Sequence, residues 1–158
     1  MAAYAQQQLN GLVSNMYREG FLDEQFQQIR ALDEGGSPDF LVEVMGLFCT
    51  DAERILNELS SLLNQPDVDY KKVDAYVHQL KGSSASVGAQ SVKLACMLVR
   101  ESCDKSDREG CLQALNLAKQ RFYELSKRLK IMIQVAFPRV IYLLIFRLIC
   151  YKSLSSIS

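Results

Sequence analysis

The chain has 158 residues, of which 49% are hydrophobic and 23% are charged, and these proportions exclude a disordered chain. This length predicts one domain with a sizeable core that needs neither disulfides nor a structural metal. Residues 1–134 hold fifteen basic and eighteen acidic side chains, a formal charge of −3, whereas residues 135–158 carry +3. The mildly acidic body disfavours nucleic acid as a partner.

The cysteine and histidine content argues against a metal site. The five cysteines are odd in number, include no C-x-x-C pair and mostly fall on apolar faces of predicted helices, so we interpret them as reduced, buried thiols. They are Cys49, Cys96, Cys103, Cys111 and Cys150. With one histidine there is no His/Cys cluster for zinc. The first residues lack the basic and apolar regions of a signal peptide, which predicts a reducing compartment.

Two short helices are predicted first. Apolar residues recur at helical spacing over residues 4–17, and a second helix opens at Phe21 and stops at 33–36. Its inward side is predicted to hold Phe26, Ile29 and Leu32.

A long third helix is predicted next, because Ser37, Pro38 and Asp39 together form a strong start signal. It should run to Asn64, before Pro66 ends it. Its predicted inward stripe is Phe40, Val44, Leu47, Phe48, Ile55, Leu59 and Leu62.

Three further helices follow. The fourth spans residues 70–87 and should end at Gly88 in a left-handed conformation, and the fifth runs from about Gln90 to Cys103. Ser106 and Glu109 match a capping box, which predicts that the sixth helix begins there. Its bundle-forming seam is Leu115, Ala118, Phe122, Leu125, Leu129 and Met132.

No strand pattern and no internal repeat compete with these helices. Four longer helices with short connections predict an all-α fold, an antiparallel four-helix bundle with two additional short N-terminal helices. We therefore divide the chain into a helical domain at 1–134 and an atypical tail at 135–158.

The tail does not fit the bundle pattern. Pro138 should end the sixth helix, and residues 140–151 are then apolar or aromatic except for Arg147. A membrane span needs about 20 apolar residues, so this run predicts no span. Three alternatives stay open: a poorly placed end, packing onto the bundle, and association with a membrane surface.

The lone histidine lies on the fourth helix. A helical wheel places Val73, Tyr76, Val77, Leu80, Ser84 and Val87 on one inward stripe. His78 falls about 140° from Val73 and is predicted to point outward.

Small residues are expected to ring this histidine, and Lys81 to flank it. The ring is Ala75, Gly82, Ala85 and Ala89, all too small to shield an imidazole from another protein. A lone histidine is most often a core or surface residue without a special role, but the outward angle disfavours the core. Glycine inside a helix costs about 1 kcal/mol relative to alanine, so Gly82 needs a reason such as close approach by another backbone, unless it reflects drift or fraying.

The segment from His78 to Ala89, H-Q-L-K-G-S-S-A-S-V-G-A, resembles the plant histidine-containing phosphotransfer proteins of cytokinin-type phosphorelays. That family's phosphoacceptor segment has the form H-Q-x-K-G-S-S-x-S-x-G-A. The chain is also similar to the family at residues 20–26, 37–40 and 47–48. The likeness covers about five-sixths of the chain and ends near Gln134, after which family members usually continue with polar residues.

The resemblance implies roles for individual residues. His78 matches the phosphoacceptor, and Lys81 the lysine that helps to hold the phosphoryl oxygens. Gln79 and Ser83 match polar neighbours, and Gly82 the small residue that admits the partner's loops.

The resemblance also implies a relay. His78 would take a phosphoryl group from the receiver-domain aspartate of a hybrid sensor histidine kinase and pass it to the receiver aspartates of response regulators. The partner's receiver domain would supply Mg²⁺, so we expect no cofactor on this chain and no autokinase activity. An exposed imidazole is mostly uncharged and nucleophilic at neutral pH.

For the docking surface we nominate the outward side of the second helix, with Asp23, Gln27 and Gln28, together with Ala75 and Ala85. A monomer is expected, and a chain of this size can pass between cytoplasm and nucleus without a signal. The sequence is compatible with two other functions. A helical adaptor that binds receivers without phosphotransfer is disfavoured by the presence of His78, and an enzyme that uses His78 as a general base is disfavoured by the lack of a pocket.

Overall fold

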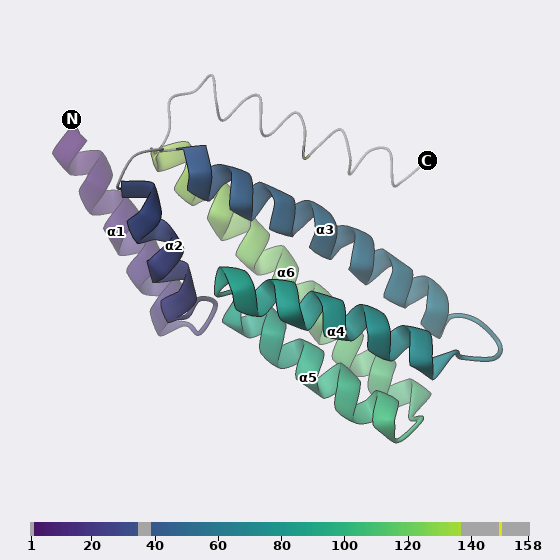
Figure 1. Ribbon diagram of the computed structural model, residues 1–158. Helices are drawn as coiled ribbons and strands as arrows, with labels where there is room; N and C mark the ends of the chain where they lie inside the picture. Colours follow the sequence, from purple (N-terminus) through teal and green to yellow (C-terminus); the bar gives the residue numbers. More distant parts are fainter. Residues whose placement is uncertain (1, 35–38, 137–148, 150–158) are drawn as a thin grey trace.

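The computed structural model describes residues 2–34, 39–136 and 149 of the chain (Figure 1). Within these residues it forms six helices and no strand, as predicted. The helices are α1 (Ala2–Arg18), α2 (Glu24–Glu34), α3 (Asp39–Leu63), α4 (Tyr70–Val87), α5 (Gln90–Asp104) and α6 (Arg108–Ala136).

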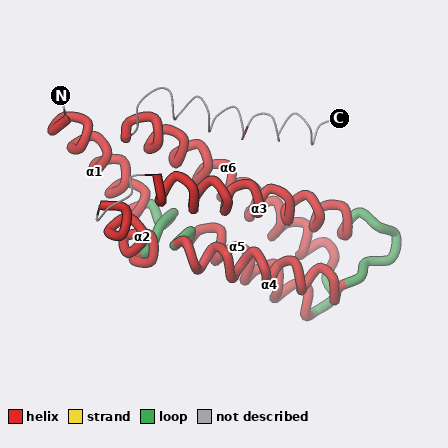
Figure 2. The backbone as a smooth tube through the Cα atoms, turned by 45° about the horizontal axis from the view of Figure 1, so that its top comes forward, coloured by secondary structure: helices red, strands yellow, loops and turns green. Residues whose placement is uncertain are grey.

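Helices α3 to α6 form the predicted four-helix bundle. Around the bundle, α3 packs against α4, α4 against α5, α5 against α6, and α6 against α3. Short connections reverse the chain between successive helices, so neighbours are antiparallel. Helix α1 packs on α6, and α2 contacts α3 and α4, so the two N-terminal helices cover one end of the bundle (Figure 2).

One continuous hydrophobic core joins the bundle to the N-terminal helices. The predicted seam of α6 is confirmed, since its members are buried except for the partly buried Phe122. With 29 residues, α6 is about 43 Å long and extends beyond the bundle to α1. There the Arg128 guanidinium pairs with Glu19 and lies 4.6 Å from the centroid of the Phe21 ring.

Three predicted core residues are exposed instead: Leu32 by 67%, Phe40 by 39% and Leu47 by 72%. Leu32 follows Ile29 by three residues, and each such step turns about 60° backwards around a helix, which carries Leu32 away from Phe26. In α3, the buried stripe is centred on Met45 and Ala52 and lies on the side opposite Phe40 and Leu47.

Two helix starts also differ from the predictions. Helix α2 begins at Glu24 and not at Phe21, which is buried in the preceding turn. Helix α6 begins at Arg108, because Ser106 adopts a left-handed φ of 51° in the turn after α5. Asp107 caps α6 in place of the predicted Ser106, accepting a 3.0 Å hydrogen bond from the backbone N–H of Gly110. The start signal at Ser37 lies outside the described residues.

Pro138 and the tail also lie outside the described residues, except for Ile149, so the three alternatives for the tail stay open. Ile149 is helical and half-buried, and it lines a pocket between α3 and α6 together with Cys49 and Phe122. No helix among the described residues is long and apolar enough to cross a membrane. The four described cysteines are buried and free, as predicted, and Cys150 lies outside the described residues.

Candidate functional site

Helix α4 is capped at both ends, by Asp69 and Gly88. The Asp69 carboxylate accepts a 3.2 Å hydrogen bond from the backbone N–H of Lys72 and caps the first turn. Gly88 ends the helix with φ 75°, in the left-handed conformation predicted for it. The inward stripe holds five buried residues, Val73, Val77, Leu80, Ser84 and Val87, and fixes the rotation of the helix.

His78 lies on the outward side of this helix and is exposed, as predicted. Ala75, Gly82 and Ala85 are exposed around it. A Cβ atom added to Gly82 would meet nothing within 4 Å, so packing within this chain does not require a glycine there. The imidazole therefore stands among small, exposed residues, on a side of α4 that another protein can approach.

Ala89 does not belong to this ring, contrary to the prediction. It is fully buried and is the N-cap residue of α5. The left-handed turn at Gly88 ends the regular periodicity of α4, so a helical angle does not apply to Ala89.

Lys81 lies on the side of α4 that faces α5 and is half-buried. Burial raises the pKa of the Cys96 thiol on α5 to about 12, and the positive charge of Lys81 is close enough to oppose this rise. Because Lys81 follows His78 by three residues, the two side chains are neighbours on the helix surface. The structure thus brings a cation next to the candidate phosphoacceptor.

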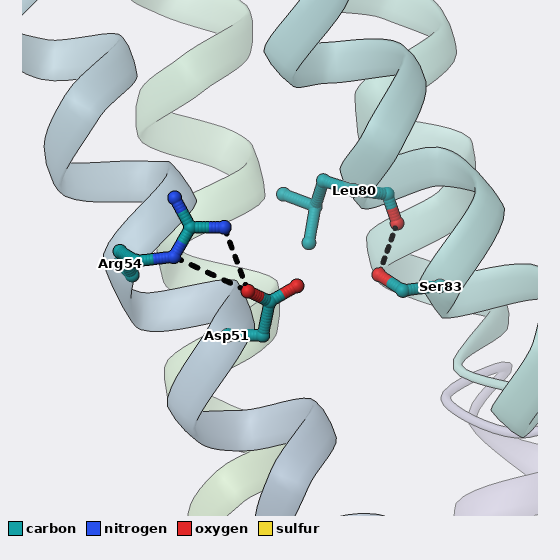
Figure 3. A network of polar contacts seen from close by, with 4 residues as sticks. All are labelled: Asp51, Arg54, Leu80 and Ser83. Carbon is teal, nitrogen blue, oxygen red and sulfur yellow. Dashed lines mark hydrogen bonds and ion pairs between the residues drawn. The ribbon is translucent and has the colours of Figure 1, made fainter.

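Gln79 and Ser83 are placed differently. Gln79 is exposed, next to His78 in sequence but about 100° around the helix. Ser83 is half-buried, and its hydroxyl donates a 3.1 Å hydrogen bond to the Leu80 carbonyl (Figure 3). The same view shows the Asp51–Arg54 pair of the neighbouring α3, with 2.8 Å between Oδ1 and Nη2. Ser83 follows Lys81 by two residues, about 200° around the helix, so the two side chains leave α4 on different sides.

Of the nominated docking residues, Asp23 lies in the turn before α2, at the far end of α4, and Gln27 and Gln28 lie on α2. The backbone N–H of Asp23 donates to the Gly88 carbonyl at 3.0 Å, and its Oδ1 accepts from the backbone N–H of Gln25 at 2.9 Å. Gln27 and Gln28 are exposed. Gly88 follows His78 by ten residues, about 15 Å along the helix axis. Asp23 thus has a structural role at the end of α4.

An ion pair that the sequence analysis did not single out lies one turn before His78. The Nε of Arg100 on α5 lies 3.1 Å from Oδ1 of Asp74 on α4. Asp74 precedes His78 by four residues and shares its side of the helix. No group of three or more His, Cys, Asp or Glu side chains in the described part of the chain is arranged to hold a metal ion.

The site can be compared with known proteins. A family model described as the Hpt domain matches residues 43–135, which is more than half of the chain and covers most of the bundle. The chain belongs to the Hpt domain family. The resemblance found in the segment from His78 to Ala89 is thereby confirmed.

Relatives and solved structures of the Hpt family agree with this membership. Histidine-containing phosphotransfer protein 2 of rice is 54% identical over 135 residues, which are 85% of this chain and 91% of the rice protein. The crystal structure of a maize histidine-containing phosphotransfer protein superposes with a TM-score of 0.80 at 54% identity, covering 83% of this chain and 96% of the maize chain. A rice structure described as a putative histidine-containing phosphotransfer protein gives 0.80 at 51% identity, over 85% and 95% of the two chains.

Proposed function

We propose that this Hpt-family chain is a phosphorelay carrier with His78 as the phosphoacceptor. In this proposal His78 receives the phosphoryl group from the receiver aspartate of a hybrid sensor histidine kinase. It then passes the group to the receiver aspartates of response regulators, in a two-component pathway of the cytokinin type. The chain has no autokinase activity of its own and serves as an intermediate between its partners.

The observation that carries this proposal is the surface around His78. The imidazole is exposed on α4, and exposed Ala75, Gly82 and Ala85 leave room for a receiver domain to bring its aspartyl phosphate to the ring. Asp74, the carboxylate one turn before His78, is bound by Arg100. A general base would need a carboxylate that orients the imidazole, so this arrangement favours a nucleophile over a general base.

The transfer is a substitution at phosphorus. The ring nitrogen of His78 that carries the lone pair attacks in line, the new P–N bond forms, and the bond to the aspartyl oxygen breaks with its electron pair left on the carboxylate. Lys81 offsets negative charge on the equatorial phosphoryl oxygens. The proton on the other ring nitrogen is released to water when the imidazolium loses its charge.

The rest of the catalytic machinery is assigned to the partner. We propose that the receiver domain supplies Mg²⁺, and that Gln79 and Ser83 act as polar neighbours of the docked receiver. Asp23, Gln27, Gln28, Ala75 and Ala85 are the proposed docking residues. We further propose that the carrier is a monomer that works in both cytoplasm and nucleus.

The test is phosphoryl transfer from a labelled hybrid-kinase receiver domain to the purified full-length chain. We expect the label to reach the chain within the assay and to be chased onto a second receiver domain. His78→Gln should remain unlabelled and fold normally, because the side chain it replaces is exposed. A labelled His78→Gln variant would contradict the proposal.

A variant that ends at Ala136 serves as the matched control for the tail. If the variant is labelled and the full chain is not, the full chain acts as an adaptor that binds receivers without accepting phosphate. Binding of the unlabelled full chain to the receiver, measured by calorimetry, would support that adaptor. If neither chain is labelled, the carrier proposal is wrong.

A further inference from the structure

An acidic side chain lies one helical turn before the proposed phosphoacceptor. Asp74 and His78 are four residues apart on α4, which places their Cβ atoms about 5–6 Å from each other. Side chains on a helix lean toward its N-terminus, so the imidazole of His78 leans over the turn that carries Asp74 and Ala75. A phosphoryl group on His78 would therefore be formed next to a carboxylate that repels it.

Arg100 changes the charge balance at this point. Its Nε–H donates a 3.1 Å hydrogen bond to Oδ1 of Asp74, across the contact between α5 and α4. Both side chains keep more than a third of their surface exposed, at 36% for Arg100 and 37% for Asp74. A guanidinium has five N–H groups, and those on the two Nη atoms make no hydrogen bond within the described part of the chain.

We propose that Arg100 is a second cation for the phosphoryl group on His78, and that Asp74 is the positioning residue that holds it there. This inference rests on the proposed function, since it concerns the same phosphohistidine. Lys81 approaches the phosphoryl group from the turn after His78, and Arg100 from the turn before it. The two cations then stand on the α5 side of the phosphoacceptor, and the receiver domain approaches from solvent.

The proposal predicts opposite effects for the two members of the ion pair. In hydrolysis without a partner, the phosphoryl group carries about two negative charges in phosphohistidine and about one in the loose, metaphosphate-like transition state. A nearby cation therefore stabilises phosphohistidine more than it stabilises the transition state, and hydrolysis becomes slower. Arg100→Gln removes the cation and leaves Asp74 uncompensated, which shortens the lifetime of phosphohistidine. Asp74→Asn keeps an oxygen that accepts from Arg100 and removes the repelling charge, which lengthens the lifetime.

The test uses phosphoramidate as a small phosphoryl donor, so that no partner protein is needed. The ring nitrogen of His78 attacks its phosphorus, a P–N bond forms, the donor's own P–N bond breaks, and the nitrogen leaves as ammonia with a proton from water. The half-life of the phosphorylated full-length chain is then followed by ³¹P NMR. We expect it to fall about fivefold in Arg100→Gln and to rise about twofold in Asp74→Asn.

Three controls separate this role from a merely structural ion pair. Arg100→Lys keeps the charge and should stay within about twofold of the wild-type half-life. Arg121→Gln breaks a similarly exposed ion pair, with Glu124 within α6, a helix that does not contact α4, and should leave the half-life unchanged. Urea denaturation of each variant reports any loss of stability separately.

The outcomes are distinct from those of the transfer assay. If phosphoramidate labels His78 but a receiver domain does not, the carrier function fails and the lifetime test still decides the role of Arg100. Equal half-lives, or shifts of Arg100→Gln and Asp74→Asn in the same direction, would overturn the inference. Failure of the wild-type chain to take phosphate from phosphoramidate would overturn it too, because the inference requires that His78 carries a phosphoryl group.

Discussion

Two glycines of the α4 segment, Gly82 and Gly88, are fixed by different requirements. A Cβ atom on Gly88 would collide with the backbone nitrogen of Phe26 and come within 2.8 Å of the Asp23 carboxylate. Gly88 also has a φ of 75°, which favours glycine. Gly82 has ordinary helical geometry, and a Cβ atom there would meet nothing within 4 Å.

This difference separates what the fold needs from what it tolerates. Gly88 lets α4 turn into α5 while α2 packs closely against the turn, so the folded chain alone explains it. Gly82 costs about 1 kcal/mol of helix stability relative to alanine, and no close contact within the molecule requires a glycine there. Under the proposed function, the reason for Gly82 lies outside the chain, at the surface where a receiver domain meets His78.

The largest effect is expected for Gly88→Ala. The left-handed conformation costs an L-residue about 1–2 kcal/mol, and the contact with Phe26 forces α2 to move as well. We expect the free energy of unfolding to fall by about 3 kcal/mol, measured by urea denaturation. A loss below about 1 kcal/mol would show that α2 can move away at little energetic cost. The fold would then not require a glycine at position 88, just as it does not require one at position 82.

A pH-dependent loss of stability is expected on the inward side of the contact between α4 and α5. Burial raises the pKa of Cys96 to about 12, against about 8.5 in an unfolded chain. Above about pH 8.5 the unfolded thiol releases its proton while the folded one keeps it, so the free energy of unfolding falls as pH rises.

The size of this loss follows from the slope of about 1.4 kcal/mol per pH unit for one group. Between about pH 8 and about pH 10, the wild-type chain should lose about 2 kcal/mol more than Cys96→Val, as measured by urea denaturation at both pH values. Cys96→Val keeps an apolar side chain of similar size and removes the thiol. Equal losses in the two proteins would mean that the buried thiol ionises as it does in water.

The sequence predicts features that depend on one helix at a time. The period of α4 placed His78 outward and Leu80 inward, and the glycine at its end predicted the left-handed turn. These features follow from local geometry, because the angle between residues of one helix does not depend on its neighbours. The same reasoning failed at Ala89, where the helix had already ended.

Features that depend on how the helices pack against each other could not be predicted from the sequence. Leu47 is exposed because α3 turns a different side toward the bundle, and no count along α3 alone sets that rotation. The pairing of Asp74 with Arg100 joins residues 26 positions apart, so it requires the alignment of α4 with α5. One part of this pairing could have been predicted from the sequence. Asp74 lies four residues before His78, which places a negative charge on the same side of α4.

The smallest effect on stability, and the sharpest test of the comparison, is expected at Gly82. Gly82→Ala should raise the free energy of unfolding by about 1 kcal/mol, because alanine favours the helix and nothing lies in its way. Gly82→Leu should stabilise the helix to a similar extent, yet slow transfer from a receiver domain about tenfold or more, because the larger side chain obstructs docking. Transfer from phosphoramidate to His78 should be nearly unaffected, since so small a donor needs no flat surface. If Gly82→Leu accepts phosphate from the receiver at the wild-type rate, the partner does not need the glycine, and its presence has no functional reason.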